Sequence, residues 1–141
     1  MRRFCCLISL GLLTLSSCKK ESNSGTANST QSDYEKRIIG SWQGKDISFN
    51  KYDSTGKLVS SNSDKMAATW NFRDTQLVIT EDKRSDTLGY SVASSNNKTF
   101  LILHNENATE IRSLTAKELV IVFERSGSKK SRNEDVYRFS R

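Results

Sequence analysis

Hydrophobic residues in this chain occur in short runs, each separated from the next by a polar segment. Between residues 38 and 139 the runs are rich in β-branched and aromatic side chains and recur about every ten residues, as in strands joined by turns. Apolar and polar residues alternate at Leu119, Ile121 and Phe123, and again at Tyr137 and Phe139. No stretch shows a long period of 3.6 residues, so the pattern predicts an all-β domain.

Short sequential strands predict an antiparallel up-and-down order, and closure into a barrel is the usual way to remove exposed edges. We therefore predict a small antiparallel up-and-down β-barrel of about eight strands. The first two predicted strands either stay separate or form one bent strand, and one helical turn is expected at 34–39. The strands are expected at 38–45, 47–52, 57–61, 66–73, 76–81, 87–93, 99–104, 108–114, 119–125 and 136–140.

The beginning of the chain differs from this pattern. Arg2 and Arg3 precede an apolar stretch at 4–15, which is too short for a membrane-spanning helix but has the length of a signal-peptide core. Residues 19–33 contain no apolar side chain larger than alanine, so they predict a flexible tether.

Residues 15–18 read Leu-Ser-Ser-Cys and resemble the bacterial lipoprotein signal. The resemblance implies cleavage before Cys18 and a diacylglycerol on its thiol, and two or more acyl chains hold a protein firmly at a bilayer. In the enterobacterial sorting system that this signal resembles, an Asp after the lipidated Cys retains a lipoprotein at the inner membrane. By that resemblance Lys19 implies the outer membrane, and both its periplasmic and its external face stay open as the location of the domain. The alternative is an ordinary secretory signal. The expected division is a signal peptide at 1–17, a lipidated cysteine and tether at 18–36, and a barrel domain at 37–141.

This division changes what composition and charge imply. The chain has 141 residues, three cysteines and a formal charge of +6. Cys5 and Cys6 leave with the signal peptide and Cys18 carries lipid, so the mature chain has no thiol for a disulfide, a metal or nucleophilic catalysis. Loss of Arg2 and Arg3 leaves 20 basic residues against 16 acidic ones, a charge of +4. Without aromatic residues interleaved among the basic ones, nucleic acid is not expected as a partner.

Gly40 and Trp42 match the Gly-x-Trp signature of the lipocalins, and the runs at 70–72 and 111–120 look like segments of small lipocalin-like domains in Bacteroidetes lipoproteins. The resemblance spans about 37–141. It implies that Trp42 closes the barrel floor and that Arg138, from the last strand, packs across its ring as a cation–π pair. The chain lacks the Thr-Asp-Tyr motif, the C-terminal helix and the size of the larger lipocalins.

Two functions follow from this resemblance. The first is non-enzymatic binding of a small apolar or amphipathic ligand, since an eight-stranded barrel either holds one small ligand or is filled by side chains. The alternative is an envelope accessory protein whose barrel is a scaffold without an internal ligand, and whose loops or outer face bind another protein or a glycan. The expected ligand-binding residues are Trp70, Phe72, Tyr90, Leu101, Ile121 and Phe123.

No motif predicts catalysis, a metal or a cofactor, so the protein is predicted not to be an enzyme. His104, the only histidine, is expected at an exposed strand end. The acidic pairs at 81–82 and 134–135 are expected in solvated turns, not as carboxylates facing each other across a cleft. The basic loop at 129–132 is expected as a solvated hairpin tip, with anionic lipid or acidic polysaccharide as the alternative partner.

Overall fold

The computed structural model describes residues 31–104, 108–125 and 131–141, which form one helix and nine strands. No helix in this part of the chain is long and apolar enough to cross a bilayer. The elements are α1 (Gln31–Ile38), β1 (Gly40–Asp53), β2 (Leu58–Lys65), β3 (Ala68–Arg73), β4 (Gln76–Glu81), β5 (Arg84–Ser95), β6 (Lys98–Leu103), β7 (Thr109–Leu114), β8 (Glu118–Arg125) and β9 (Ser131–Ser140).

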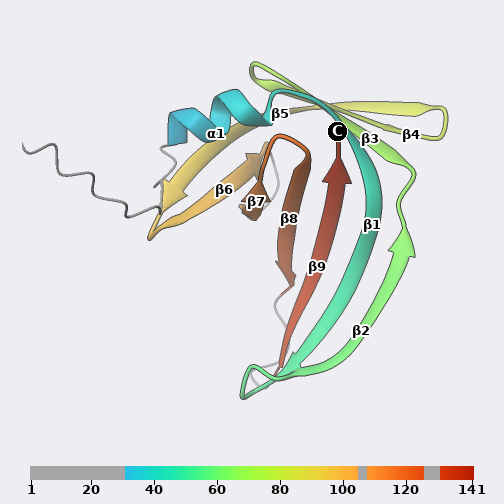
Figure 1. Cartoon of the computed structure of the whole chain (residues 1–141), viewed down its shortest axis with the longest axis vertical. Coiled ribbons are helices and arrows are strands. Elements are labelled where there is room, and N and C mark those ends of the chain that lie inside the picture. Colours follow the sequence, from blue (N-terminus) through green and yellow to red (C-terminus); the bar gives the residue numbers. More distant parts are fainter. Residues whose placement is uncertain (1–30, 105–107, 126–130) are drawn as a thin grey trace, which may run out of the picture.

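The strand order closes on itself. The first residues of β1 pair with β3, the strands from β3 to β9 then pair in chain order, and β9 returns to pair with β1. All pairings are antiparallel. The predicted fold is therefore confirmed: β1 and β3–β9 form a closed antiparallel barrel of eight strands. β2 lies outside the closed ring and pairs with the later part of β1 (Figure 1).

β1 is one bent strand, the second of the two arrangements expected for its sequence. Its register with β9 shifts between Gly44 and Asp46, a β-bulge that bends the strand. Before the bend, Trp42 pairs with Trp70 of the barrel. After the bend, β1 lies between β2 and β9, and these strands continue past the end of the barrel (Figure 1). We call this part of the sheet, residues 46–53, 58–65, 122–125 and 131–138, the extension.

Two turns show how polar residues connect successive strands. After β1, the Asp53 carboxylate accepts hydrogen bonds from the Thr55 hydroxyl and from the backbone N–H groups of Thr55 and Lys57, and Gly56 adopts a φ of +82°. The bonds from Thr55 and Lys57 hold the pKa of Asp53 below its ordinary value. Asn96 and Asn97 both have positive φ and close the β5–β6 hairpin, the role for which Asn is favoured.

The core fills the barrel, and α1 covers one end of it (Figure 1). Ile38, at the end of α1, is fully buried, and Tyr34 packs against the same cluster. Aromatic rings continue through the core: the Trp70 and Phe139 centroids lie 4.8 Å apart and those of Phe72 and Tyr90 lie 5.1 Å apart. The buried cluster is Ile38, Trp42, Ala68, Trp70, Phe72, Leu77, Tyr90, Val92, Leu101, Leu103, Ile111, Leu114, Leu119, Ile121 and Phe139.

Trp42 connects the end of α1 to one end of the barrel. Its ring is fully buried and its indole N–H donates to the Ile38 carbonyl at 2.7 Å. The guanidinium carbon of Arg141 lies 3.9 Å from the centre of the Trp42 ring. Arg141 also donates to the carbonyls of Arg37, Ile38 and Ile39, so one side chain satisfies carbonyls at the end of α1 that have no partner within the helix.

The expectation that Arg138 packs across Trp42 is wrong. Gln43 pairs with Ser140 at the end of β9, so the residue beside Trp42 is the one that follows β9, Arg141. Arg138 pairs in register with Asp46, beyond the bulge. There its guanidinium donates to the Asp46 carboxylate at 2.7 Å and to the Ser48 hydroxyl at 2.8 Å.

Candidate binding face

The six residues predicted to bind a ligand lie together, but most of them form the packed core. Trp70, Tyr90, Phe72, Leu101 and Ile121 are buried members of the core cluster, and Phe123 packs against it from a half-buried position. Leu101 and Ile121 have no accessible surface, and Phe72 has 1%. A side chain without accessible surface borders no space that a water molecule could enter, so neighbouring side chains fill the barrel at these positions.

The barrel becomes more open where it meets the extension. Phe123 of β8 and Tyr137 of β9 are half buried, with ring centroids 5.0 Å apart in an edge-to-face arrangement. Ile47 pairs in register with Tyr137, and Phe49 lies two residues further along the same face of β1. Burial, with a smaller effect of Asp135, raises the pKa of Tyr137, so its hydroxyl stays protonated at neutral pH. These four side chains form an apolar surface that continues the barrel interior.

A polar pocket adjoins this apolar surface. It has a volume of about 220 Å³ and lies between β1, β2, β8 and β9. The apolar surface and the pocket together are called the inner face of the extension. The residues that line the pocket are Phe49, Asn50, Lys51, Ser60, Asn62, Arg125, Asn133 and Asp135.

The ion pair at this pocket joins Arg125 to Asp135, and the two side chains differ in exposure. The Asp135 side chain is 7% exposed, whereas that of Arg125 is 63% exposed. The carboxylate is therefore covered by its own partner, and the cation is the member that meets solvent. The expectation of a solvated turn at 134–135 is wrong for Asp135, because β9 begins at Ser131 and carries this residue on the inner face.

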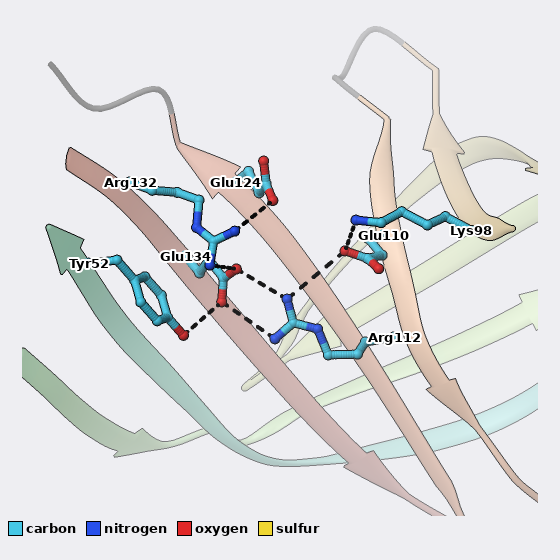
Figure 2. A network of polar contacts seen from close by, with 7 residues as sticks. All are labelled: Tyr52, Lys98, Glu110, Arg112, Glu124, Arg132 and Glu134. Atoms are coloured by element: carbon cyan, nitrogen blue, oxygen red, sulfur yellow. Dashed lines mark hydrogen bonds and ion pairs between the residues drawn. The ribbon is translucent and has the colours of Figure 1, made fainter. Parts of the chain in front are cut away.

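The same expectation is wrong for Glu134, which lies on the opposite, outer face. Its side chain is 1% exposed, yet its carboxylate accepts from Arg112 at 3.1 Å and from the Tyr52 hydroxyl at 3.1 Å. Arg132 forms a second ion pair with it at 3.2 Å and stacks on the Tyr52 ring at 4.6 Å. Figure 2 shows these contacts joining side chains from β1, β7 and β9.

In this outer network the acceptor oxygens of the Glu134 carboxylate are all in use. Burial alone would raise the pKa of Glu134, but Arg112, Arg132 and Tyr52 hold it below the ordinary value, so the group is a carboxylate with its acceptors in use. Glu110 extends the network, since it pairs with Arg112 at 4.0 Å and with Lys98 at 3.2 Å (Figure 2). Three buried valines, Val120, Val122 and Val136, lie on the same outer face. The arrangement favours a structural role, in which ion pairs cover a small apolar cluster outside the barrel.

Of the other polar positions considered in the sequence, His104 and the pair at 81–82 lie where they were expected, but the solvated hairpin tip expected at 129–132 is wrong for Arg132, which belongs to β9 and is ion-paired with Glu134. His104 is exposed directly after β6, and its backbone N–H donates to the Gly89 carbonyl at 2.9 Å. Glu81 and Asp82 are exposed around the β4–β5 turn. Across the three described ranges, no group of three His, Cys, Asp or Glu residues is placed to hold a metal ion. Cys18, the signal peptide and the loop residues 129 and 130 lie outside the described residues.

Two further hollows were weighed against the inner face. One, of about 770 Å³, follows the β4–β5 hairpin, where the acidic residues Glu81, Asp82 and Asp86 lie beside Lys83 and Arg84. The other, of about 370 Å³, lies between α1 and β5 and includes Tyr90. Neither combines an aromatic pair with a set of like-charged side chains, so the inner face is the strongest candidate.

Residue patterns could have indicated part of this face. Ile47, Phe49 and Lys51 alternate with Ser48 and Asn50, which predicts that the three share one side of a strand. The contributions of Arg125, Asn62 and Asn133 depend on which strands are neighbours, and no local signal shows that.

The fold and this face define a small closed antiparallel β-barrel with an open sheet extension that carries an amphipathic surface. A scan of protein-family models, a search of curated proteins and a search of solved structures each found no match. The lipocalin-like resemblance and the lipid anchor therefore remain predictions from the sequence.

Proposed function

We propose that this protein is a non-enzymatic binding protein of the bacterial envelope, anchored to the outer membrane by lipid on Cys18, that takes a small amphipathic ligand on the inner face of the extension. One observation carries the proposal: the half-buried Phe123–Tyr137 pair adjoins a polar pocket, whereas Leu101 and Ile121 inside the barrel have no accessible surface. The filled barrel then acts as a rigid scaffold for a site at its open end.

The physical requirements of such a site match the inner face. Binding sites combine apolar and aromatic walls with a few polar groups that set orientation, and they are most exact when built on rigid elements. Here strands supply both parts. Ile47 and Phe49 on β1 and Phe123 on β8 form the apolar wall, and the lining of the pocket supplies the polar groups. An alkyl chain would cover the apolar surface and the polar end of the ligand would lie in the pocket.

The anchor is tested by replacing Cys18. The variant Cys18→Ala is expected to lose fatty-acid labelling and to leave the membrane fraction, because no thiol remains to carry the acyl chains that hold the protein at a bilayer. Metabolic labelling with a palmitate analogue, followed by membrane fractionation, measures both effects. Cys6→Ala is the matched control and should keep its label, since residue 6 belongs to the predicted signal peptide. Labelling that survives in Cys18→Ala would refute the anchor.

The binding face is tested in the Cys18→Ala protein by titration with the fluorescent amphiphile 1-anilinonaphthalene-8-sulfonate. Phe49→Ser is expected to weaken binding about tenfold, because removal of a partly buried phenyl ring costs about 1.5 kcal/mol of apolar contact. Phe100→Ser is the control: Phe100 is also half buried on a strand, but it pairs with Glu110 on the outer side of the barrel. Equal affinities in the two variants would contradict the proposed site.

The alternative role, an envelope accessory protein, is favoured by a different surface. All eight residues of β2 are exposed, including Leu58 and Val59, and β2 pairs with β1 alone among the described strands. An edge strand of this kind can accept a strand from another chain. If the wild-type face bound no amphiphile in the titration, this second role would become the better explanation.

A further inference from the structure

The pocket of the inner face combines two cationic side chains with neutral polar ones. Lys51 contributes an ammonium group and Arg125 a guanidinium group, neither of which can accept a hydrogen bond. Asn62 and Asn133 contribute amides. The carboxylate among the lining residues, that of Asp135, is nearly buried and ion-paired with Arg125. The charged side chains that a ligand meets from solvent in this pocket are therefore the cations Lys51 and Arg125.

Nearby carboxylates do not cancel this charge at the pocket. Asp64 lies on the inner face of β2, but it pairs in register with Ile47, toward the barrel, and does not line the pocket. Asp53 follows Lys51 at the end of β1, where its carboxylate already accepts three hydrogen bonds within its own turn. Both groups lie outside the pocket, so the charge of Lys51 is available to a ligand.

The positive groups lie at a defined place relative to the apolar surface. Lys51 pairs in register with Asn133, four residues along β9 from Tyr137. At about 3.3 Å per strand residue, this places the cationic end of the pocket about 13 Å from the Tyr137 backbone. A molecule with a flexible apolar chain and a compact anionic end can cover both regions at once.

We infer that the pocket binds the anionic head group of an amphiphile, a carboxylate or a phosphate ester, with the alkyl chain directed toward Phe123 and Tyr137. The inference rests on the proposed function, because it names the ligand class of that same face. Lys51 attracts the anion as a point charge, and Arg125 adds donors that its bond to Asp135 leaves unused. The amides of Asn62 and Asn133 complete the set of donors.

The test compares amphiphiles that differ only in their head groups. Isothermal titration calorimetry of the Cys18→Ala protein, with each ligand below its micelle concentration, would use dodecanoate, dodecyl phosphate, dodecyl maltoside and dodecyltrimethylammonium. Dodecanoate and dodecyl phosphate are expected to bind about tenfold more tightly than the neutral dodecyl maltoside. Their advantage over the cationic dodecyltrimethylammonium should be larger than tenfold. Added salt should reduce this preference. The two anionic arms distinguish a carboxylate from a phosphate as the preferred head group.

Lys51→Glu should remove the preference for anions, whereas Lys65→Glu should keep it. Lys65 is an exposed lysine of the same extension that pairs with Asp46 on the outer face, so its variant makes the same charge change away from the pocket. Equal binding of all four ligands, or a preference that survives in Lys51→Glu, would overturn the inference and leave the proposed function standing. If none of the four ligands bound, both this inference and the proposed function would be overturned.

Discussion

Replacing Trp42 with alanine is expected to lower the free energy of unfolding by about 4 kcal/mol, the range typical of removing a buried aromatic side chain. The ring is fully buried, its N–H holds the Ile38 carbonyl, and Arg141 stacks on it. The substitution therefore removes apolar burial, a helix-end hydrogen bond and a cation–π contact at one point. Urea denaturation followed by far-ultraviolet circular dichroism measures the loss.

Ile39→Ala is the matched control for this prediction. Ile39 lies three residues from Trp42 and is 42% exposed, so its truncation should cost well under 1 kcal/mol. Trp42→Phe should fall between the two, since the phenyl ring keeps most of the burial but cannot donate to Ile38. If Trp42→Ala were no more destabilised than Ile39→Ala, the closed end would not depend on Trp42.

Replacing Glu134 with alanine is expected to cost about 3 kcal/mol, because it leaves Arg112 and Arg132 without the buried carboxylate that both of them contact. The half-exposed positions of these arginines place the expected value at the lower end for a broken buried pair. Glu124→Ala is the control. Glu124 pairs with Arg132 at 3.9 Å and is 53% exposed, so its removal should change stability by about 0.3 kcal/mol. If Glu134→Ala and Glu124→Ala unfolded at the same urea concentration, the burial of the Glu134 carboxylate would not contribute to stability as expected.

The same carboxylate predicts a pH dependence with a definite sign. Burial would raise the pKa of Glu134, but its donors hold it below the ordinary value of 4.5. A group whose pKa is lowered by folding stabilises the native state above its unfolded pKa and loses that effect as the pH falls through its folded pKa. Stability of the wild type should therefore fall as the pH is lowered below about 5. Glu134→Gln should show a flatter curve in urea titrations over the same range, and an unchanged slope would contradict the assignment.

The strand β9 shows what the sequence could and could not predict. The sequence predicts its end correctly through the alternation of Tyr137 and Phe139, but it places the start five residues too late. Glu134 and Asp135 resemble a polar turn because two adjacent carboxylates are usually solvated. Their burial depends on arginines from other strands: Arg112 of β7 covers Glu134, and Arg125 of β8 covers Asp135. Only the register of the finished sheet brings those partners together.

The choice between Arg138 and Arg141 has the same cause. Both arginines lie at the end of the chain, and a cation from the last strand could be expected beside Trp42. The register of β1 with β9 decides between them: Gln43 lies opposite Ser140, which puts Arg141 beside Trp42, whereas Arg138 lies opposite Asp46. No local pattern gives this register, so the barrel and its approximate strand positions were predictable, whereas the contact across Trp42 was not.

The candidate binding face could not be predicted for a related reason. Strand patterns indicate which side chains share a side, as the alternation at Leu119, Ile121 and Phe123 does. They do not indicate that β1, β2, β8 and β9 continue beyond the ring of eight strands. That overhang depends on where β3 leaves the edge of β1, at Gln43, and on β2 taking its place from Asp46 onward. The sequence accordingly predicts only the first part of β2, at 57–61, and assigns no strand to its polar residues 62–65.

The position of α1 over one end of the barrel determines whether a ligand could pass through the barrel. The helix, Trp42 and Arg141 occupy that end, and the packed core separates it from the inner face. The ligand proposed for the inner face would therefore have no route through the barrel, because the packed core and α1 close that route in the described residues.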